Sequence, residues 1–410
     1  MEGERDLCDE VASRIGRARV AMREEGYTAL LVYGNTKMNG ALRYLSGYWP
    51  DRGGWLSRGP ERKDINIFDA SLLVLPLTGE PVLVFDKGEL LDREACTART
   101  TLSSFGGDLA WQPSEAEAIA ALLRENEATG RVGIETWDKF PAPLYLDLRQ
   151  LLPGIELVPS TLVEGLMLIK SPWEVAMFRE GARIGDTGHE AFVSALREGG
   201  GRSELELVRA AEAVMRDADP IYEECSPISP SLISSGPVGR LCRLHVPLST
   251  KIIMVGDAVN WDICMRYRGY PIDTSRTRVV GKPTGRQQRA YDISLGMSVE
   301  VRKAVKPGAQ VQDLVRLAQS VAKEGGFELW DGFLGHGLGL DVHSRPDMGM
   351  EEMILSEGMV ITVEPRLDAD GWLYGNEDMV LVTADGCDTL TSFPREPLEL
   401  HAAKPLAVRL

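Results

Sequence analysis

The pattern of hydrophobic residues changes near residue 165, and this change constrains the fold more than any other feature of the chain. Before it, amphipathic helical segments alternate with short apolar runs, as where residues 6–25 precede residues 28–33, which is typical of an α/β domain. After it, helices are mixed with antiparallel strand pairs, which is typical of an α+β domain. Because 410 residues also exceed what one hydrophobic core usually supports, we predict two domains, residues 1–165 and 166–410.

A helix start marks the beginning of the second domain. Ser171 supplies an N-cap, Pro172 the first helical position and Glu174 the capping-box partner. The helices expected in this domain span residues 172–196, 204–216, 286–305 and 311–324, and the strands 231–234, 258–265, 272–279, 359–366 and 377–383. In the first domain the expected strands span residues 28–33, 71–77, 81–85 and 131–135, and the helices 6–25, 115–125 and 142–151.

Composition and charge exclude several classes of protein. Hydrophobic residues make up 44% of the chain and charged residues 26%, which is ordinary for a globular protein and excludes a disordered one. The formal charge of -16 makes the surface repel phosphate groups, so neither nucleic acid nor a membrane is an expected partner. Residues 1–10 lack the pattern of a secretion signal, and no apolar run is long enough to span a membrane, so we expect a cytoplasmic protein. The six cysteines are scattered, so neither a zinc knuckle nor a disulfide framework is expected.

Two aspartates lie on neighbouring predicted strands. Because these strands meet at a turn near residues 267–270, Asp262 and Asp273 are expected to lie close together. Two buried carboxylates repel each other and lose their hydration, unless a cation lies between them. The pair therefore predicts either two strand ends exposed to solvent or a cation site.

Further metal-ligating side chains follow in the second domain. His336 begins a glycine-rich run that ends at His343, and imidazole is the commonest nitrogen ligand of first-row metals. Glu364 ends an apolar strand and Glu377 begins another, and either residue alone fits a solvated strand end. With the two aspartates, these residues supply four carboxylates and an imidazole, a set that suits two divalent ions sharing bridging carboxylates.

These motifs resemble those of the pita-bread metallohydrolases, which include methionine aminopeptidase, aminopeptidase P, prolidase and creatinase. The matching motifs are Asp262 with Asp273 eleven residues later, Gly-His336-Gly-Leu-Gly-Leu-Asp-Val-His343, Val-Glu364-Pro and Asn-Glu377-Asp. The resemblance covers nearly the whole chain, from about residue 10 to 160 and from about 172 to 395. It implies an α/β creatinase-type N-terminal domain followed by an α+β pita-bread (creatinase/aminopeptidase) catalytic domain.

The resemblance also implies roles for these residues. The metal ligands would be Asp262 on one ion, His336 and Glu364 on the other, and Asp273 and Glu377 bridging both. Glu364 would also shuttle a proton, while His245 and His343 would bind substrate and stabilise the oxyanion. Two divalent metal ions are therefore expected as cofactors, with manganese favoured by the carboxylate-rich shell and cobalt, iron and zinc as alternatives.

The activity that the resemblance implies is metal-dependent hydrolysis of a small C–N bond, most simply by an Xaa-Pro dipeptidase or aminopeptidase. The substrate would be a short peptide or another small molecule. One alternative is a non-peptidase of the same fold that acts on a small metabolite, such as a creatinase, an ectoine hydrolase or a dimethylsulfoniopropionate lyase. The lyases carry an extra aspartate where this chain has Asn260, which argues against that chemistry. A binding module without chemistry is a further alternative, but it has no reason to keep five ligands together.

Three positions depart from the pattern of the proline-specific members. Gly332 stands where those members often have His, Gly375 where they usually have Arg, and Arg366 where they usually have Gly. Arg366 either pairs with a metal ligand, holds a substrate carboxylate or lies on the surface. Cys264 lies two residues after Asp262 and hence on the same strand face, so it is either close to the metals or a buried bystander.

The resemblance further implies a homodimer, in which the N-terminal domain of one chain overhangs the active site of the other. The polar segment from Trp49 to Lys63 is expected to be a loop. Its arginines, Arg52, Arg58 and Arg62, are then either candidates for substrate recognition or residues that only keep the loop soluble.

Overall fold

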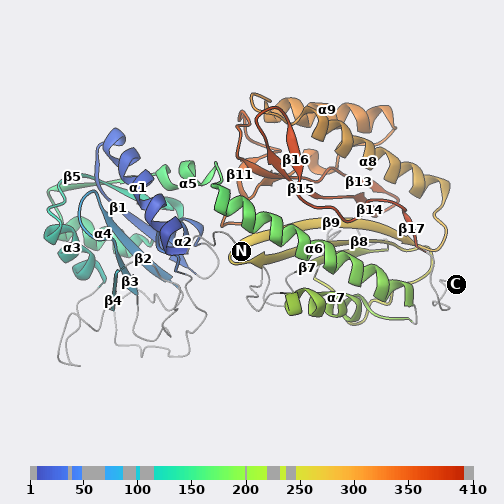
Figure 1. The fold of residues 1–410 in the computed structure, drawn as a ribbon, viewed down its shortest axis with the longest axis horizontal. Helices are drawn as coiled ribbons and strands as arrows, with labels where there is room; N and C mark the ends of the chain where they lie inside the picture. The colour runs from blue at the N-terminus through green and yellow to red at the C-terminus, as the bar shows by residue number, and fades with distance from the viewer. Residues whose placement is uncertain are drawn as a thin grey trace. The chain divides into compact units, whose positions relative to one another are not determined.

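The computed structural model describes residues 7–35, 39–48, 70–85, 98–101, 115–198, 201–218, 231–236 and 246–400. The chain divides into two compact units, residues 1–167 and 168–410 (Figure 1). Each unit has its own apolar clusters and is described by itself. Within the described residues, none of the helices combines the length and apolar character that crossing a membrane requires.

A six-stranded mixed sheet forms the frame of the first unit. Its strands lie in the order β4-β3-β2-β1-β5-β6. Their bounds are β1 Tyr27–Asn35, β2 Ala70–Pro76, β3 Val82–Phe85, β4 Ala98–Thr101, β5 Gly130–Glu135 and β6 Ile155–Pro159. The central strand β1 pairs antiparallel with β2 and parallel with β5. It is buried at successive positions, because elements pack on both faces of the sheet.

Helices cover this sheet, as the α/β pattern predicts. The helices are α1 Leu7–Glu25, α2 Gly40–Ser46, α3 Glu115–Glu125, α4 Ala142–Leu151 and α5 Leu162–Met167, with a short 3-10 helix η2 at Trp137–Lys139. α3 and α4 share one apolar cluster with β1, β2 and β5, while α1 and α2 also contact β1. The strands β4 and β6 and the helices α2 and α5 were not predicted, because such short segments carry no clear periodicity. Cys8 is disulfide-bonded, which the scattered cysteine spacing did not predict either.

Two pairs of helices enclose the strands of the second unit (Figure 1). They are α6 Pro172–Glu198 with α7 Glu204–Ala218, and α8 Gly285–Ala304 with α9 Val311–Glu324. The predicted capping box starts α6, since the Ser171 N–H donates to Glu174 Oε2 at 3.0 Å and the Glu174 N–H donates to Ser171 Oγ at 3.2 Å. α6 and α7 pack with β8 and β9 in one apolar cluster, and α8 and α9 pack with β12 and β15 in another.

The strands of the second unit form two sheets and a separate hairpin. One sheet has the order β17-β9-β8-β7 and the other β11-β10-β12-β15-β16, while β13 pairs with β14. Their bounds are β7 Ser231–Ser235, β8 Ala258–Tyr267, β9 Tyr270–Val280, β10 His336–Gly337, β11 Ser344–Asp347, β12 Val360–Val363, β13 Arg366–Ala369, β14 Trp372–Gly375, β15 Asp378–Val382, β16 Cys387–Thr389 and β17 Glu399–Leu400, with a 3-10 helix η3 at Trp330–Gly332. Antiparallel pairing dominates, which confirms the α+β class of this half.

The single strand predicted over residues 359–366 is wrong, because it is two strands. β12 ends at Val363 and β13 begins at Arg366, with Glu364 and Pro365 between them. Proline has no N–H to donate to a ladder, so the pairing with β15 stops before it. The N–H of Glu364 donates instead to the carbonyl oxygen of Leu334 at 2.9 Å, which holds the Glu364 backbone beside the chain that leads to β10.

Candidate metal centre

A tight hairpin brings the two aspartates together. β8 and β9 are joined by Arg268 and Gly269, which both have positive φ, as the favoured two-residue hairpin turn requires. Asp273 lies directly opposite Cys264, which is two positions beyond Asp262 on β8. Side chains two apart on a strand and directly across a pair share a face, so all three project to the same side.

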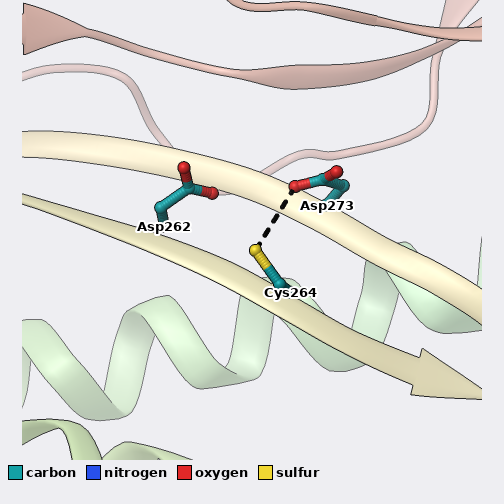
Figure 2. A group of neighbouring side chains, drawn as sticks. All are labelled: Asp262, Cys264 and Asp273. Carbon is teal, nitrogen blue, oxygen red and sulfur yellow. Dashed lines mark hydrogen bonds between the residues drawn. The ribbon is translucent and has the colours of Figure 1, made fainter. Parts of the chain in front are cut away.

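Both aspartates are buried, with exposed fractions of 5% for Asp262 and 4% for Asp273. The alternative of two solvent-exposed strand ends is therefore wrong. Figure 2 shows Cys264 beside them, with its Sγ 3.9 Å from Asp273 Oδ1. One ligand atom from each of the three residues lies within 4.8 Å of the others, so Cys264 lies close to the predicted ligands, and its side chain is partly exposed rather than buried.

The remaining members of the cluster come from the five-stranded sheet. His336 lies on β10, Glu364 directly follows β12, and Glu377 directly precedes β15. His336 Nε2 is 3.4 Å from Asp273 Oδ2 and 3.5 Å from Glu364 Oε1. Ligand atoms of Asp273, His336 and Glu377 lie within 4.8 Å of one another. The fold thus gathers residues that are far apart in the sequence into one buried cluster.

Thr362 and two glycines set the position of His336. The Thr362 hydroxyl accepts a hydrogen bond from the His336 N–H at 3.0 Å and donates one to Glu364 Oε1 at 3.1 Å. A Cβ at Gly335 would overlap the Thr362 carbonyl oxygen, and one at Gly337 would overlap the carbonyl oxygen of Arg345. Glycines therefore flank His336 because the neighbouring backbones approach it so closely.

Arg366 lies inside the cluster. Its Nη2 is 2.8 Å from Asp262 Oδ2, 3.0 Å from Glu364 Oε2 and 3.3 Å from Glu377 Oε2. The residue is only 6% exposed, so the alternative of a surface arginine is wrong and pairing with the predicted ligands is what the structure shows. Gly375 lies directly opposite on β14, and a Cβ there would be 2.7 Å from Arg366 Cγ.

The carboxylates of the cluster outnumber its positively charged groups, and this excess of negative charge shifts several pKa values. Burial raises the pKa of Asp262 to about 7, with Arg366 opposing the shift and neighbouring carboxylates adding to it. Burial and the surrounding carboxylates also raise the pKa of Glu377 well above its usual range. For His336, burial would lower the pKa, but the hydrogen bond and charge of Asp273 and the charge of Glu364 raise it to about 9. The repulsion behind these shifts is relieved when the cluster binds protons, and a bound cation would relieve it in the same way.

Two oxygens of the cluster also lack a hydrogen-bond partner. Asp262 Oδ1 and Glu377 Oε1 are buried, and neither finds a partner among the described residues. Buried polar atoms normally have partners, and carboxylate oxygens with an imidazole are donors that divalent ions such as manganese, cobalt, iron or zinc accept. The residues present therefore fit a divalent metal site.

The predicted catalytic histidines have different outcomes. The ring of His343 lies 4.3 Å from that of His336, centroid to centroid, at the exposed side of the cluster. Partial desolvation and the neighbouring His336 lower the pKa of His343 below its usual value. His245 lies outside the described residues, as does the segment from Trp49 to Lys63 with its three arginines.

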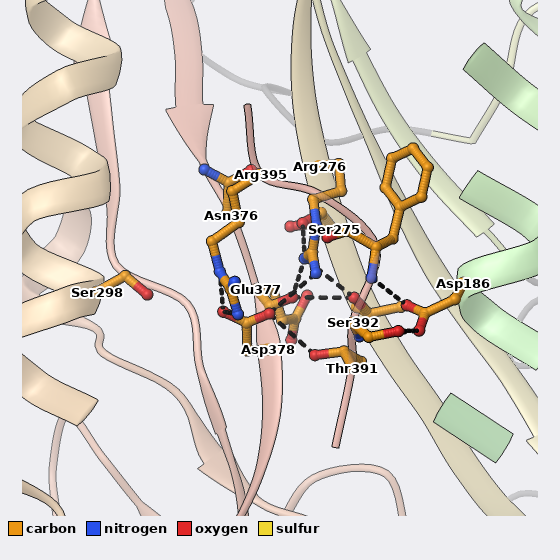
Figure 3. A network of polar contacts seen from close by, with 12 residues as sticks. Asp186, Ser275, Arg276, Ser298, Asn376, Glu377, Asp378, Thr391, Ser392 and Arg395 are labelled. Carbon is orange, nitrogen blue, oxygen red and sulfur yellow. Dashed lines mark hydrogen bonds and ion pairs between the residues drawn. The ribbon is translucent and has the colours of Figure 1, made fainter. Parts of the chain in front are cut away.

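A buried ion network supports the backbone at Glu377 (Figure 3). Asp378 pairs with Arg276 at 2.9 Å and with Arg395 at 2.7 Å, and it accepts a hydrogen bond from Thr391. Arg276 also donates to the Glu377 carbonyl oxygen at 2.6 Å. Burial alone would raise the pKa of Asp378, but the arginines outweigh it and keep the pKa below its usual range. The network therefore fixes β15 where Glu377 enters the cluster.

Sequence reasoning did not identify Thr362, Arg276 or Asp378 as part of the site. Thr362 carried a signal, because it lies two positions before Glu364, close enough in sequence for its hydroxyl to reach that carboxylate. The role of Arg276 depends on contacts across about a hundred residues, which no local pattern reveals. Asn260 uses its amide to donate to Thr277 Oγ1 and the Gly375 carbonyl, so it is part of the strand packing.

Comparison with known proteins gives the same architecture. Residues 176–384 match metallopeptidase family M24, and residues 14–166 match the creatinase/prolidase N-terminal domain. The prolidase structure from Pyrococcus horikoshii OT3 superposes with a TM-score of 0.72 at 23% identity, over 94% of this chain and 99% of that one, which shows a shared fold.

Two relatives illustrate the sequence similarity. The Xaa-Pro dipeptidase of Pyrococcus furiosus is 33% identical over 240 residues, which cover 58% of this chain and 66% of that protein. The chain thus spans just under two thirds of the length of that relative. The putative dipeptidase YkvY of Bacillus subtilis is 30% identical over 393 residues, 94% of this chain and 99% of that one.

Fold and site together define a creatinase-type N-terminal domain followed by a pita-bread catalytic domain. The chain belongs to metallopeptidase family M24.

Proposed function

We propose that this chain is a metal-dependent hydrolase of a small C–N bond and that it acts as an Xaa-Pro dipeptidase or aminopeptidase on short peptides. One observation carries the proposal: four carboxylates and one imidazole are buried together, with orphaned oxygens, in a chain of family M24. A cluster of like charges costs stability unless cations occupy it, so its presence argues for a metal-dependent activity.

The roles proposed for the ligands follow the sequence motifs. Asp262 would hold one ion, Asp273 and Glu377 would bridge, and His336 and Glu364 would hold the other. We propose manganese, because the donor set is rich in carboxylates. When bound, two such ions supply an activated water and polarise the scissile carbonyl group.

The chain's own residues would handle protons and orientation. Glu364, held by Thr362, would take a proton from the attacking water and pass it to the leaving amine. His343, beside His336, would donate to the carbonyl oxygen as it gains negative charge. We propose the same role for His245.

Several wider expectations are part of the same proposal. We propose domain boundaries at residues 1–165 and 166–410, a homodimer, and residence in the cytoplasm without nucleic-acid or membrane partners. The net charge of -16 supports the absence of nucleic-acid and membrane partners, because both carry negative charge. Cell fractionation with immunoblotting of the full chain tests the location. Sedimentation of the full chain tests the dimer.

The substrate is tested with manganese-loaded protein and a peptide panel. The panel contains Xaa-Pro dipeptides, longer peptides with proline in second position, and matched Xaa-Ala dipeptides. We expect the Xaa-Pro substrates to be preferred, and the longer peptides separate an aminopeptidase from a dipeptidase. His343→Ala should lower kcat/KM by about 10²-fold, and Asp273→Asn should abolish metal-dependent turnover. If none of the peptides in the panel were cleaved, the proposal would be overturned.

A further inference from the structure

Arg366 occupies the place that a cation would take among the acidic side chains. A single nitrogen, Nη2, lies within 3.3 Å of oxygens from Asp262, Glu364 and Glu377. These three carboxylates come from β8 and from the ends of β12 and β15, and no two of them are neighbours in the sequence. One nitrogen shared by three converging carboxylates therefore has the surroundings of a bound ion.

The fold is adapted to this position of the arginine. β13 and β14 place Gly375 directly across from Arg366, and a side chain at that position would collide with the arginine stem, 2.7 Å from Cγ. Gly375 has no positive φ, so its backbone does not itself require glycine. A Cβ at residue 375 would also lie 3.2 Å from the Pro365 carbonyl oxygen, and the arginine stem is the nearest of the contacts that exclude a side chain there.

The same contacts argue against a role in holding a substrate carboxylate. The side chain of Arg366 is 8% exposed, and its Nη2 is already shared by three protein carboxylates. Its Nε is buried and has no hydrogen-bond partner among the described residues. An arginine that clamps a ligand needs an open face for its paired donors, and this one faces the cluster.

The positive charge of Arg366 lies where it bears on metal binding. The carboxylates of Asp262, Asp273, Glu364 and Glu377, when ionised, balance two divalent ions. A guanidinium among them adds a further positive charge, and its Nη2 lies 2.8 Å from Asp262 Oδ2, an oxygen of the ligand proposed for one ion alone. We propose that Arg366 is an internal counter-ion, which substitutes for a metal ion when the centre is empty and competes with the ion on the Asp262 side. This inference rests on the proposed metal-dependent function.

The test is calorimetric titration of the chelator-stripped full chain with manganese. Arg366→Gln removes the competing charge and should tighten the weaker manganese-binding event about tenfold. Gly375→Ala keeps the arginine but displaces its stem, so it should tighten the same event. Arg183→Gln, at an exposed arginine paired with Glu180, and Gly386→Ala, with no neighbour within 4 Å among the described residues, are the matched controls.

A second measurement covers the case in which Arg366→Gln folds poorly. Without metal, its melting temperature should lie below that of the wild type, and manganese should raise it by more than it raises the wild type. Unchanged or weaker manganese binding in both Arg366→Gln and Gly375→Ala would overturn this inference and leave the proposed function intact. If no protein bound manganese, or cobalt, iron or zinc in the same titration, the proposed function would fail, and this inference with it.

Discussion

Thr362 shows how one hydroxyl can hold two side chains of the candidate centre. It is fully buried, and it joins the His336 backbone to the Glu364 carboxylate. Thr362→Val keeps the shape but leaves the His336 N–H without its acceptor. We predict a loss of about 1–3 kcal/mol in the free energy of unfolding, together with weaker manganese binding.

Denaturant unfolding and metal titration measure these two effects. Thr362→Ser retains the hydroxyl and is the matched control, so it should keep manganese binding close to that of the wild type. Equal behaviour of the valine and serine variants would show that the hydroxyl does not position the ligands.

His189 links stability to pH at a site away from the metal centre. Its ring is 1% exposed, stacks on Phe393 and lies against Trp261. Burial lowers its pKa well below the usual value, and the charges of Arg276 and Arg278 lower it further. The folded protein therefore binds fewer protons at this site than the unfolded chain does. The resulting stabilisation is complete above about pH 6.5 and is lost as the pH falls below that value.

We predict that His189→Gln removes this part of the pH dependence. Between pH 7 and pH 5.5 the wild type should lose about 1 kcal/mol more unfolding free energy than the variant. Urea unfolding at the two pH values measures the difference. Parallel losses in the two proteins would mean that His189 is protonated alike in the folded and unfolded states.

The two-residue strand β10 is held between close backbone neighbours. It carries His336 and pairs with β11 on one side and β12 on the other. Gly337→Ala would drive a methyl group into the Arg345 carbonyl, so the β10–β11 pairing must shift. We predict a loss of about 2 kcal/mol in unfolding free energy and several-fold weaker manganese binding. Gly386→Ala, which meets no neighbour within 4 Å in the described part of the chain, should change stability by less than about 0.5 kcal/mol, and similar losses in both variants would contradict the prediction.

Most elements could be predicted from local pattern, whereas the contacts between them could not. The β8–β9 hairpin and the start of α6 follow from alternation and capping residues. The break at Pro365 does not follow from the pattern, because the mostly apolar residues 359–363 run directly into Glu364 and look like the start of a longer strand. The burial of Arg366 was left undecided, because it depends on which residue of β14 lies opposite, and register is set by the whole hairpin.

At the scale of the whole molecule, side chains from both sheets of the second unit meet in one cluster. Asp262 and Asp273 come from one sheet, and His336, Glu364 and Glu377 come from the other. The residue types predict that these side chains suit two divalent ions, and the resemblance to the pita-bread metallohydrolases implies that they share one centre. The supporting network of Arg276, Asp378 and Arg395 was not predictable, because buried ion pairs form between segments with no shared local pattern. The fold class was predictable because helices alternate with short apolar strands in the first half, whereas the second half contains antiparallel strand pairs.

The most direct test of a metal-dependent peptidase is release of proline from an Xaa-Pro dipeptide by the chelator-stripped full chain, before and after manganese is restored. We predict no release from the stripped protein, and release once manganese is added. The same treatment of Asp273→Asn should give no release in either state. Proline release that is equal with and without metal, or that manganese cannot elicit, would contradict the central claim.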